Sequence, residues 1–170
     1  MGKILHSNSF FSSLLEVIGI RRSGKPTRSV REVHGIGKLR AVLRRADFVV
    51  LTLPATPDTE GLIDAAALDV MQTGAGLINM GRAGVLDHDA LAARLSDGRL
   101  GGAILDVHER EPILKSSPIW SVPNLILTPH VSSDDDVTYV PRTLDLVFGN
   151  LGRLLAGKRL VNRVDPVLGY

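Results

Sequence analysis

Short apolar runs alternate with amphipathic segments along the chain from residue 17 onward. The runs are continuous and rich in β-branched residues, as in "DFVVLTLP", where Pro54 ends the run. Such runs are typical of strands that are buried on both faces of a parallel sheet. The pattern predicts strands over 17–20, 47–53, 76–81, 101–107 and 125–128.

The segments between these runs carry apolar residues at helical spacing. In "LRAVLRRA", which begins at Leu39, apolar residues recur at i, i+3, i+4 and i+7. Asp87 is well placed as the N-cap of a later helix, and Gly157 as a residue just beyond the last one. The alternation predicts an α/β fold, a parallel sheet with helices on both faces. The predicted helices cover 39–46, 64–71, 87–97 and 140–156.

The first fourteen residues fit this alternation badly, so we divide the chain into an atypical segment (1–14), one domain (15–157) and a tail (158–170). The opening "MGKILHSNSFFSSLL" lacks the continuous apolar core of a signal peptide. No apolar run approaches the ~20 residues of a membrane span. There is no cysteine, which excludes disulfides and thiolate catalysis and suits a reducing compartment. We therefore expect a cytoplasmic protein without a membrane partner.

Basic residues are concentrated near the beginning of the domain. Between Arg21 and Arg45 there are nine Lys or Arg residues and one acid, Glu32. A nucleic-acid face is disfavoured, because no aromatic residue lies within the run and no reading motif accompanies it. Two interpretations remain open: a solvated helix face, or a local field that favours a phosphate group.

Polar side chains follow the predicted strands at the ends where open parallel sheets bind ligands: Arg82, Asp106, Glu111 and His130. An arginine can hold a carboxylate by two parallel hydrogen bonds. A histidine can exchange a proton near neutral pH, and a neighbouring carboxylate orients its ring. Taken singly, each residue also suits a surface turn, a loop, a cap or ordinary packing, and we interpret His108 as non-catalytic. Together they suit proton transfer to a carbonyl next to a carboxylate.

Four ordered blocks make the sequence recognisable, namely 51–64 ("LTLPATPDTEGLID"), 77–91 ("LINMGRAGVLDHDAL"), 103–112 ("AILDVHEREP") and 123–133 ("PNLILTPHVSS"). Together they resemble the nucleotide-binding domain of the D-isomer-specific 2-hydroxyacid dehydrogenases. The tail over 155–170 is similar to the family's C-terminal stretch, so the resemblance covers most of residues 15–170. It implies a Rossmann-like fold.

The resemblance also implies roles for individual residues. Arg82 would bind the substrate carboxylate, His130 would be the acid/base, and Glu111 would be its partner. Asp106 would face the nicotinamide carboxamide. The other residues that would line the cofactor are Leu53, Pro54, Thr59, Met80 and Gly81.

The chain departs from the family pattern in two respects. Family members open with a substrate domain and a G-x-G-x-x-G turn, neither of which is found here, so we expect a sheet that is incomplete at its N-terminal side. At the end of the strand over 17–20, where NAD enzymes carry an acid for the ribose, this chain has Arg21 and Arg22. Arginines attract a 2′-phosphate, so NADP(H) is favoured as the cofactor. NAD remains the alternative if an arginine only stacks on the adenine.

Two functions from different classes fit these observations. The first is an NAD(P)-dependent oxidoreductase that interconverts a 2-oxo acid and a D-2-hydroxy acid, similar to a glyoxylate/hydroxypyruvate reductase. The second is a truncated, catalytically inactive module that keeps the fold for interaction or dimerisation. Family members commonly pair through this domain, so the resemblance implies a homodimer. No nucleic-acid partner is expected.

Overall fold

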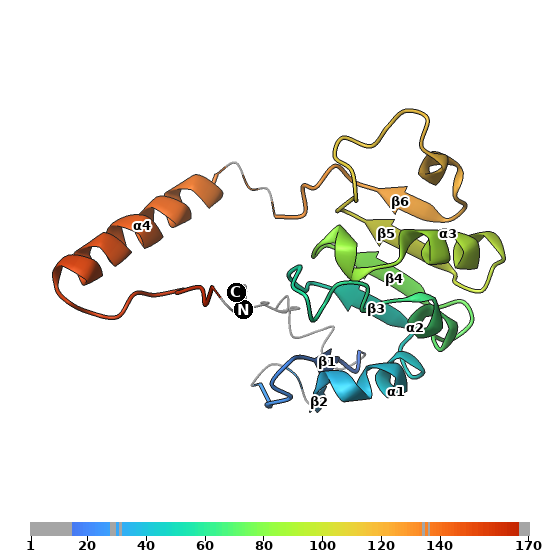
Figure 1. The fold of residues 1–170 in the computed structure, drawn as a ribbon, viewed down its shortest axis with the longest axis horizontal. Coiled ribbons are helices and arrows are strands. Elements are labelled where there is room, and N and C mark those ends of the chain that lie inside the picture. Colours follow the sequence, from blue (N-terminus) through green and yellow to red (C-terminus); the bar gives the residue numbers. More distant parts are fainter. Residues whose placement is uncertain (1–14, 28–29, 31, 134, 136, 167–170) are drawn as a thin grey trace.

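A computed structural model describes residues 15–27, 30, 32–133, 135 and 137–166. The expected N-terminal segment, 1–14, and the last four residues of the tail lie outside the described residues. A four-stranded sheet, ordered β3-β4-β5-β6, forms the centre of the body (Figure 1). All three of its strand pairs are parallel, which confirms the predicted α/β class. Its strands are β3 (Phe48–Leu51), β4 (Gly76–Asn79), β5 (Gly102–Leu105) and β6 (Leu125–Leu127).

A separate two-stranded sheet lies beside this one. β1 (Ile18–Ile20) pairs in parallel with β2 (Glu32–His34). The strand β1 was predicted, whereas β2 falls in the basic segment, where a solvated helix face was one interpretation. The helical part of that segment begins only at Ile36, with the 3-10 turn η1 (Ile36–Lys38). That interpretation is therefore wrong for the residues of β2.

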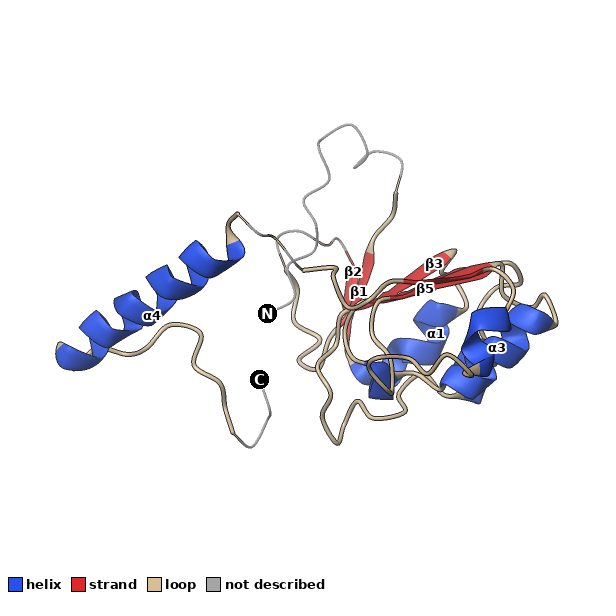
Figure 2. Ribbon diagram, turned by 90° about the horizontal axis from the view of Figure 1, so that it is seen from above, coloured by secondary structure: helices blue, strands red, loops and turns tan. Residues whose placement is uncertain are grey.

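Three helices pack on one face of the sheets, α1 (Leu39–Leu43), α2 (Ala65–Asp69) and α3 (His88–Ser96) (Figure 2). The carboxylate of Asp64 accepts the backbone N–H of Ala67 to cap α2, and Asp87 accepts that of Ala90 to cap α3, as predicted. Alternate strand residues point toward these helices and build the core. Its fully buried members include Leu68, Leu77, Leu91, Leu95 and Leu105.

The opposite face of the four-stranded sheet carries apolar side chains that stay exposed to solvent. Phe48 is 72% exposed, Val50 52% and Ile126 58%. Val50, Ile78, Ile104 and Ile126 share one register row across the four strands. Within the described residues, the helices predicted on both faces of the sheet are therefore found on one face only, and the other face is open to solvent.

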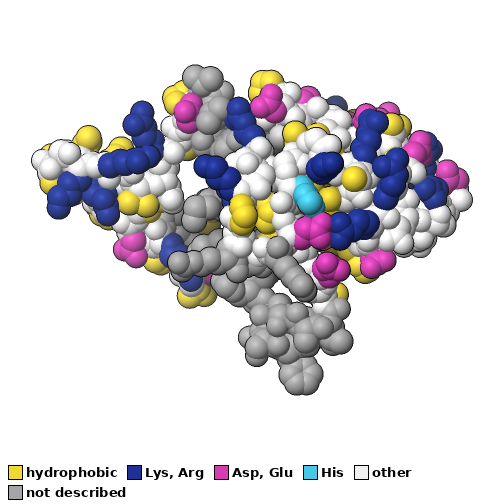
Figure 3. Space-filling view, turned by 90° about the horizontal axis from the view of Figure 1, so that it is seen from below, with side chains coloured by type: hydrophobic (Ala, Val, Ile, Leu, Met, Phe, Trp, Pro, Cys, Tyr) yellow, Lys and Arg dark blue, Asp and Glu magenta, His cyan; other side chains and the backbone are white. Residues whose placement is uncertain are grey.

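The helix α4 (Tyr139–Leu155) points away from the body (Figure 1). It agrees closely with the helix predicted over 140–156, and Gly157 follows it with a φ of 64°, the left-handed conformation expected there. In the space-filling view, Lys and Arg side chains lie at the left, where α4 and the segment after it are found, and on the body at the right (Figure 3). Among the described residues, no helix has the length and apolar character needed to cross a bilayer. The apolar side chains that α4 exposes are Val140, Leu144, Val147, Phe148, Leu151, Leu154 and Leu155.

Candidate active site

The sheet order brings the predicted catalytic side chains to one edge. Arg82 follows β4, Asp106 follows β5 and His130 follows β6, and these three strands are neighbours. Because parallel strands end at the same edge, the segments that carry these side chains lie next to one another there. The expectation that the strands are neighbours is confirmed.

Asp106 holds the segment that carries His130 in place by hydrogen bonds. Its Oδ1 accepts the Thr128 hydroxyl at 2.5 Å and the Val131 N–H at 2.9 Å, while Oδ2 accepts the Ser132 N–H at 2.9 Å. The residue is only 3% exposed. Burial acts to raise the pKa of Asp106, but the hydrogen bonds from Ser132, Thr128 and Val131 outweigh it and hold the pKa well below its usual range. A charged carboxylate thus fixes the backbone just after His130 and the Thr128 side chain just before it.

Glu111 and His130 form the pair that the sequence predicts. The Nδ1 atom of His130 lies 3.0 Å from Oε2 of Glu111, and both side chains are about two-fifths exposed. The pKa of Glu111 is lowered, first by the hydrogen bond with His130 and next by the backbone N–H of His108. His130 has a φ of 60°, a left-handed conformation that is uncommon for residues other than glycine. The contact on Nδ1 leaves Nε2 as the ring atom for proton exchange.

Arg82 lies at the end of β4 and is exposed to solvent. Its Nη1 donates to the carbonyl oxygen of Gly81 at 2.7 Å. Behind it, the fully buried Asn79 donates from Nδ2 to the carbonyl of Arg82 and accepts the N–H of Gly81 on Oδ1, each at 3.1 Å. Sequence reasoning missed Asn79, although a polar residue inside the apolar strand "LINM" was a usable signal.

The turns predicted to line the cofactor pack directly against each other. A Cβ added to Gly81 would lie 2.7 Å from the carbonyl oxygen and 2.8 Å from the nitrogen of Leu53, so only glycine fits. The hydroxyl of Thr59 donates to the carbonyl of Pro54 at 2.7 Å and accepts the N–H of Thr56 at 2.9 Å. Met80, next to Gly81, is 37% exposed at the same edge.

The end of β1 approaches the same turn. Arg22 forms an ion pair of 3.8 Å with Asp58, whose turn also contains Pro54 and Thr59. Arg21 donates its backbone N–H to the carbonyl of His34 at 3.0 Å, and its side chain is exposed. Both arginine side chains are thus exposed at the end of β1, and guanidinium groups are donors that suit a phosphate.

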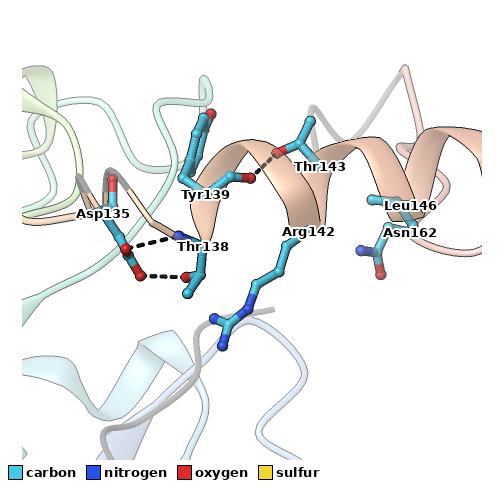
Figure 4. A pocket seen from close by; sticks show the side chains of 8 residues that line it. Asp135, Thr138, Tyr139, Arg142, Thr143, Leu146 and Asn162 are labelled. Atoms are coloured by element: carbon cyan, nitrogen blue, oxygen red, sulfur yellow. Dashed lines mark hydrogen bonds between the residues drawn. The ribbon is translucent and has the colours of Figure 1, made fainter.

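Two hollows lie near these elements. One, of about 370 Å³, adjoins Glu111 and has mostly apolar walls. Its lining residues are His108, Glu111, Pro112, Ile113, Trp120, Leu127, Thr128 and Pro129. The other lies beside the first turns of α4, where Asp135 accepts the backbone N–H groups of Val137 and Thr138, and it contains none of the predicted site residues (Figure 4).

Comparison with known proteins identifies the same family as the sequence blocks. Residues 11–132 match the model described as "D-isomer specific 2-hydroxyacid dehydrogenase, NAD binding domain". The chain is 35% identical over 149 residues to glyoxylate/hydroxypyruvate reductase A of Escherichia fergusonii, which covers 88% of this chain and 47% of the reductase. The corresponding reductase of Citrobacter koseri is 34% identical over the same length. The chain thus spans about half the length of these relatives.

Solved structures give the same result. An NADPH-dependent glyoxylate/hydroxypyruvate reductase from Sinorhizobium meliloti, in complex with NADP and sulfate, superposes with a TM-score of 0.85 at 36% identity, covering 94% of this chain and 50% of that one. A D-isomer specific 2-hydroxyacid dehydrogenase from Xanthobacter autotrophicus, in complex with NADPH and MES, superposes with a TM-score of 0.83 at 38% identity, covering 91% and 63%. The fold is that of their nucleotide-binding domains.

Proposed function

Because this chain belongs to the D-isomer specific 2-hydroxyacid dehydrogenases, we propose that it acts in the NAD(P)-dependent interconversion of a small 2-oxo acid and a D-2-hydroxy acid. The observation that carries the proposal is the 3.0 Å contact between Glu111 and His130, at the sheet edge where Arg82 follows a neighbouring strand. A fold kept only for interaction has no need of this arrangement. The names of the similar reductases support glyoxylate or hydroxypyruvate as substrates.

Each side chain has a distinct part in this reaction. Arg82, whose guanidinium has donors beyond the one given to Gly81, would bind the substrate carboxylate through two parallel hydrogen bonds. His130 would donate a proton from Nε2 to the carbonyl oxygen of the oxo acid, while Glu111 holds Nδ1 and stabilises the charged ring. The nicotinamide cofactor supplies the hydride when it is bound. In the reverse direction, Nε2 of His130 would accept the hydroxyl proton.

The residues at the cofactor edge fit a phosphorylated dinucleotide. Arg21 and Arg22 supply guanidinium groups for a 2′-phosphate, and relatives were solved with NADP or NADPH. The turns that contain Leu53 and Gly81 would lie along the cofactor. Asp106 would accept the nicotinamide carboxamide on Oδ2, which accepts one hydrogen bond from the chain's backbone and has capacity for another.

The proposal is tested by NADPH oxidation with glyoxylate as the substrate. We expect His130→Gln to lower kcat by about a hundredfold or more, because the proton donor is lost. Lys115→Gln, an exposed side chain of the loop that carries Glu111, serves as the control and should leave the rate unchanged. Equal rates for wild type and His130→Gln would overturn the assignment of the acid/base.

A second function is favoured by one observation, the exposed apolar face of α4. Under this alternative the chain keeps the fold as an interaction or dimerisation module, and the homodimer stays a prediction. Titration calorimetry with NADPH separates the two functions. Binding that is weakened when Arg21 and Arg22 are replaced supports the enzyme, whereas undetectable binding by a folded chain supports the module.

A further inference from the structure

His108 contacts both segments that carry the Glu111–His130 pair. Its backbone N–H donates to Oε1 of Glu111 at 3.0 Å. Its side-chain Nε2 lies 2.8 Å from the carbonyl oxygen of Thr128, two residues before His130. The same residue therefore holds the carboxylate on one side and the backbone leading to the imidazole on the other.

The contact with Thr128 determines the protonation pattern of the His108 ring. A carbonyl oxygen can only accept a hydrogen bond, so Nε2 of His108 must carry the proton. In the neutral ring Nδ1 is then a bare acceptor, and this atom is buried without a hydrogen-bond partner among the described residues. The ring is thus held by Nε2 alone.

A second imidazole lies behind this one. His88, the first residue of α3, is also buried, and its Nε2 has no partner within the described part of the chain. Burial lowers the pKa of His88, and Glu109 and His108 act on it in opposite directions. A neutral His88 next to His108 leaves the hydrogen bond to Thr128 as the polar anchor of the His108 ring.

These hydrogen bonds form a closed cycle that includes the Glu111–His130 pair. Asp106 binds Thr128 and the backbone just after His130, Thr128 binds His108, His108 binds Glu111, and Glu111 binds His130. Loss of the hydrogen bond from the His108 side chain breaks this cycle. The loop that carries Glu111 is then no longer tied to the strand that leads to His130. The backbone N–H at position 108 would still bind Oε1 of Glu111, but the loop that carries both groups could shift, so Oε2 would no longer be directed at Nδ1.

We propose that His108 is a positioning residue. The hydrogen bond from its Nε2 to the carbonyl oxygen of Thr128 sets the alignment of Glu111 with His130. The alignment itself is a property of the fold, and only its effect on turnover rests on the function proposed above. Simple packing makes a different prediction, because any ring of similar size would then serve as well as imidazole. The hydrogen-bond donor, not the volume, is what the geometry requires.

The test compares two substitutions in the intact chain. His108→Phe keeps an aromatic ring but removes the donor, whereas His108→Gln keeps a side-chain N–H of similar reach. The readouts are the carboxyl titration of Glu111 by ¹³C NMR and the hydrogen-bonded Nδ1 proton of His130 by ¹H–¹⁵N NMR. We expect the pKa of Glu111 to rise toward its ordinary value, and the Nδ1 proton signal to be lost, in His108→Phe and not in His108→Gln.

These signals need neither cofactor nor turnover, so they can fail independently of the proposed function. A folded His108→Phe with both signals unchanged, or a His108→Gln that behaves like His108→Phe, overturns the proposal. If His108→Phe does not fold, the wild-type ¹⁵N shifts decide: protonated Nε2 with bare Nδ1 supports the proposal, and a proton on Nδ1 overturns it. In turnover, the loss is expected in kcat, about tenfold, with KM unchanged.

Discussion

The two ends of the candidate site are held together in different ways. At the catalytic end, the nearly buried Asp106 ties down the backbone around His130, and Glu111 lies within hydrogen-bonding distance of the ring. At the end of β1, the proposed adenosine end, the exposed Arg22 reaches Asp58 across 3.8 Å. Proton transfer needs atoms fixed to fractions of an ångström, whereas attraction of a phosphate needs charge and reach. The difference in construction fits the difference in chemistry that the proposed function requires.

The largest expected effect tests the catalytic end. Asp106→Ala leaves the donors of Thr128, Val131 and Ser132 without their acceptor, so we expect the free energy of unfolding to fall by roughly 4 kcal/mol. Chemical denaturation measures the loss, and Asp47→Ala, an exposed carboxylate before β3, is the control. Equal stability of the two variants would remove the contrast between the two ends.

The next effect tests the close contact between the two turns. Gly81→Ala places a Cβ against the backbone of Leu53, where neither atom can give way easily, and should cost roughly 2 kcal/mol of stability. Gly149→Ala, in α4 with nothing within 4 Å of the added Cβ, should instead stabilise by about 0.5 kcal/mol. Thermal unfolding of both variants checks the sign of each change. A neutral Gly81→Ala would mean that the two turns are not held together.

The proposed adenosine end is tested by comparing the affinities for NADPH and NADH. Replacing both Arg21 and Arg22 by Ala should weaken NADPH binding by on the order of tenfold or more and NADH binding far less, because only NADPH carries the 2′-phosphate. Titration calorimetry measures both affinities, and Arg44→Ala, just after the end of α1, is the matched exposed control. Equal losses of affinity for the two cofactors would contradict the predicted preference for NADP(H).

The smallest effect compares one partly exposed carboxylate at each end, Glu32 and Glu111. Arg45 and then His34 lower the pKa of Glu32 from 4.5 to about 2, and His130 chiefly lowers that of Glu111. A depressed folded pKa stabilises the fold above the ordinary value, and this contribution disappears as the pH falls through the folded pKa. Glu32→Gln should therefore lower the Tm slightly at pH 7, and its difference from wild type should vanish between pH 4.5 and about 2. Melting curves across that range measure it, and a difference that persists at pH 2 would contradict the assignment.

The sequence predicted the central sheet and its helices because their signals are local. Continuous apolar runs marked every strand from β3 to β6, and Asp87 marked the beginning of α3. The strand β2 was missed because three residues, "EVH", contain one apolar position and lie among basic side chains. Strand formation there depends on pairing with β1, which no local pattern reveals.

The residues of the candidate site could be predicted from the sequence, but the hydrogen bonds that hold them in place could not. The order of strand ends placed Arg82, Glu111 and His130 together, and the family blocks implied their roles. The contacts that hold the segment of His130, however, join residues 19 to 26 positions apart, as between Asp106 and Ser132. The link from His108 to Thr128 is of the same kind, so a histidine in a charged loop gave no sign of it.

The left-handed backbone at His130 has a consequence for mutagenesis. With a φ of 60°, glycine, asparagine and aspartate fit the backbone at this position best, while β-branched residues fit worst. A saturation library at position 130 would thus be filtered by two unrelated criteria, the backbone and the imidazole chemistry. Variants selected for expression and variants selected for turnover should hardly overlap, so neither screen alone would report what this position requires.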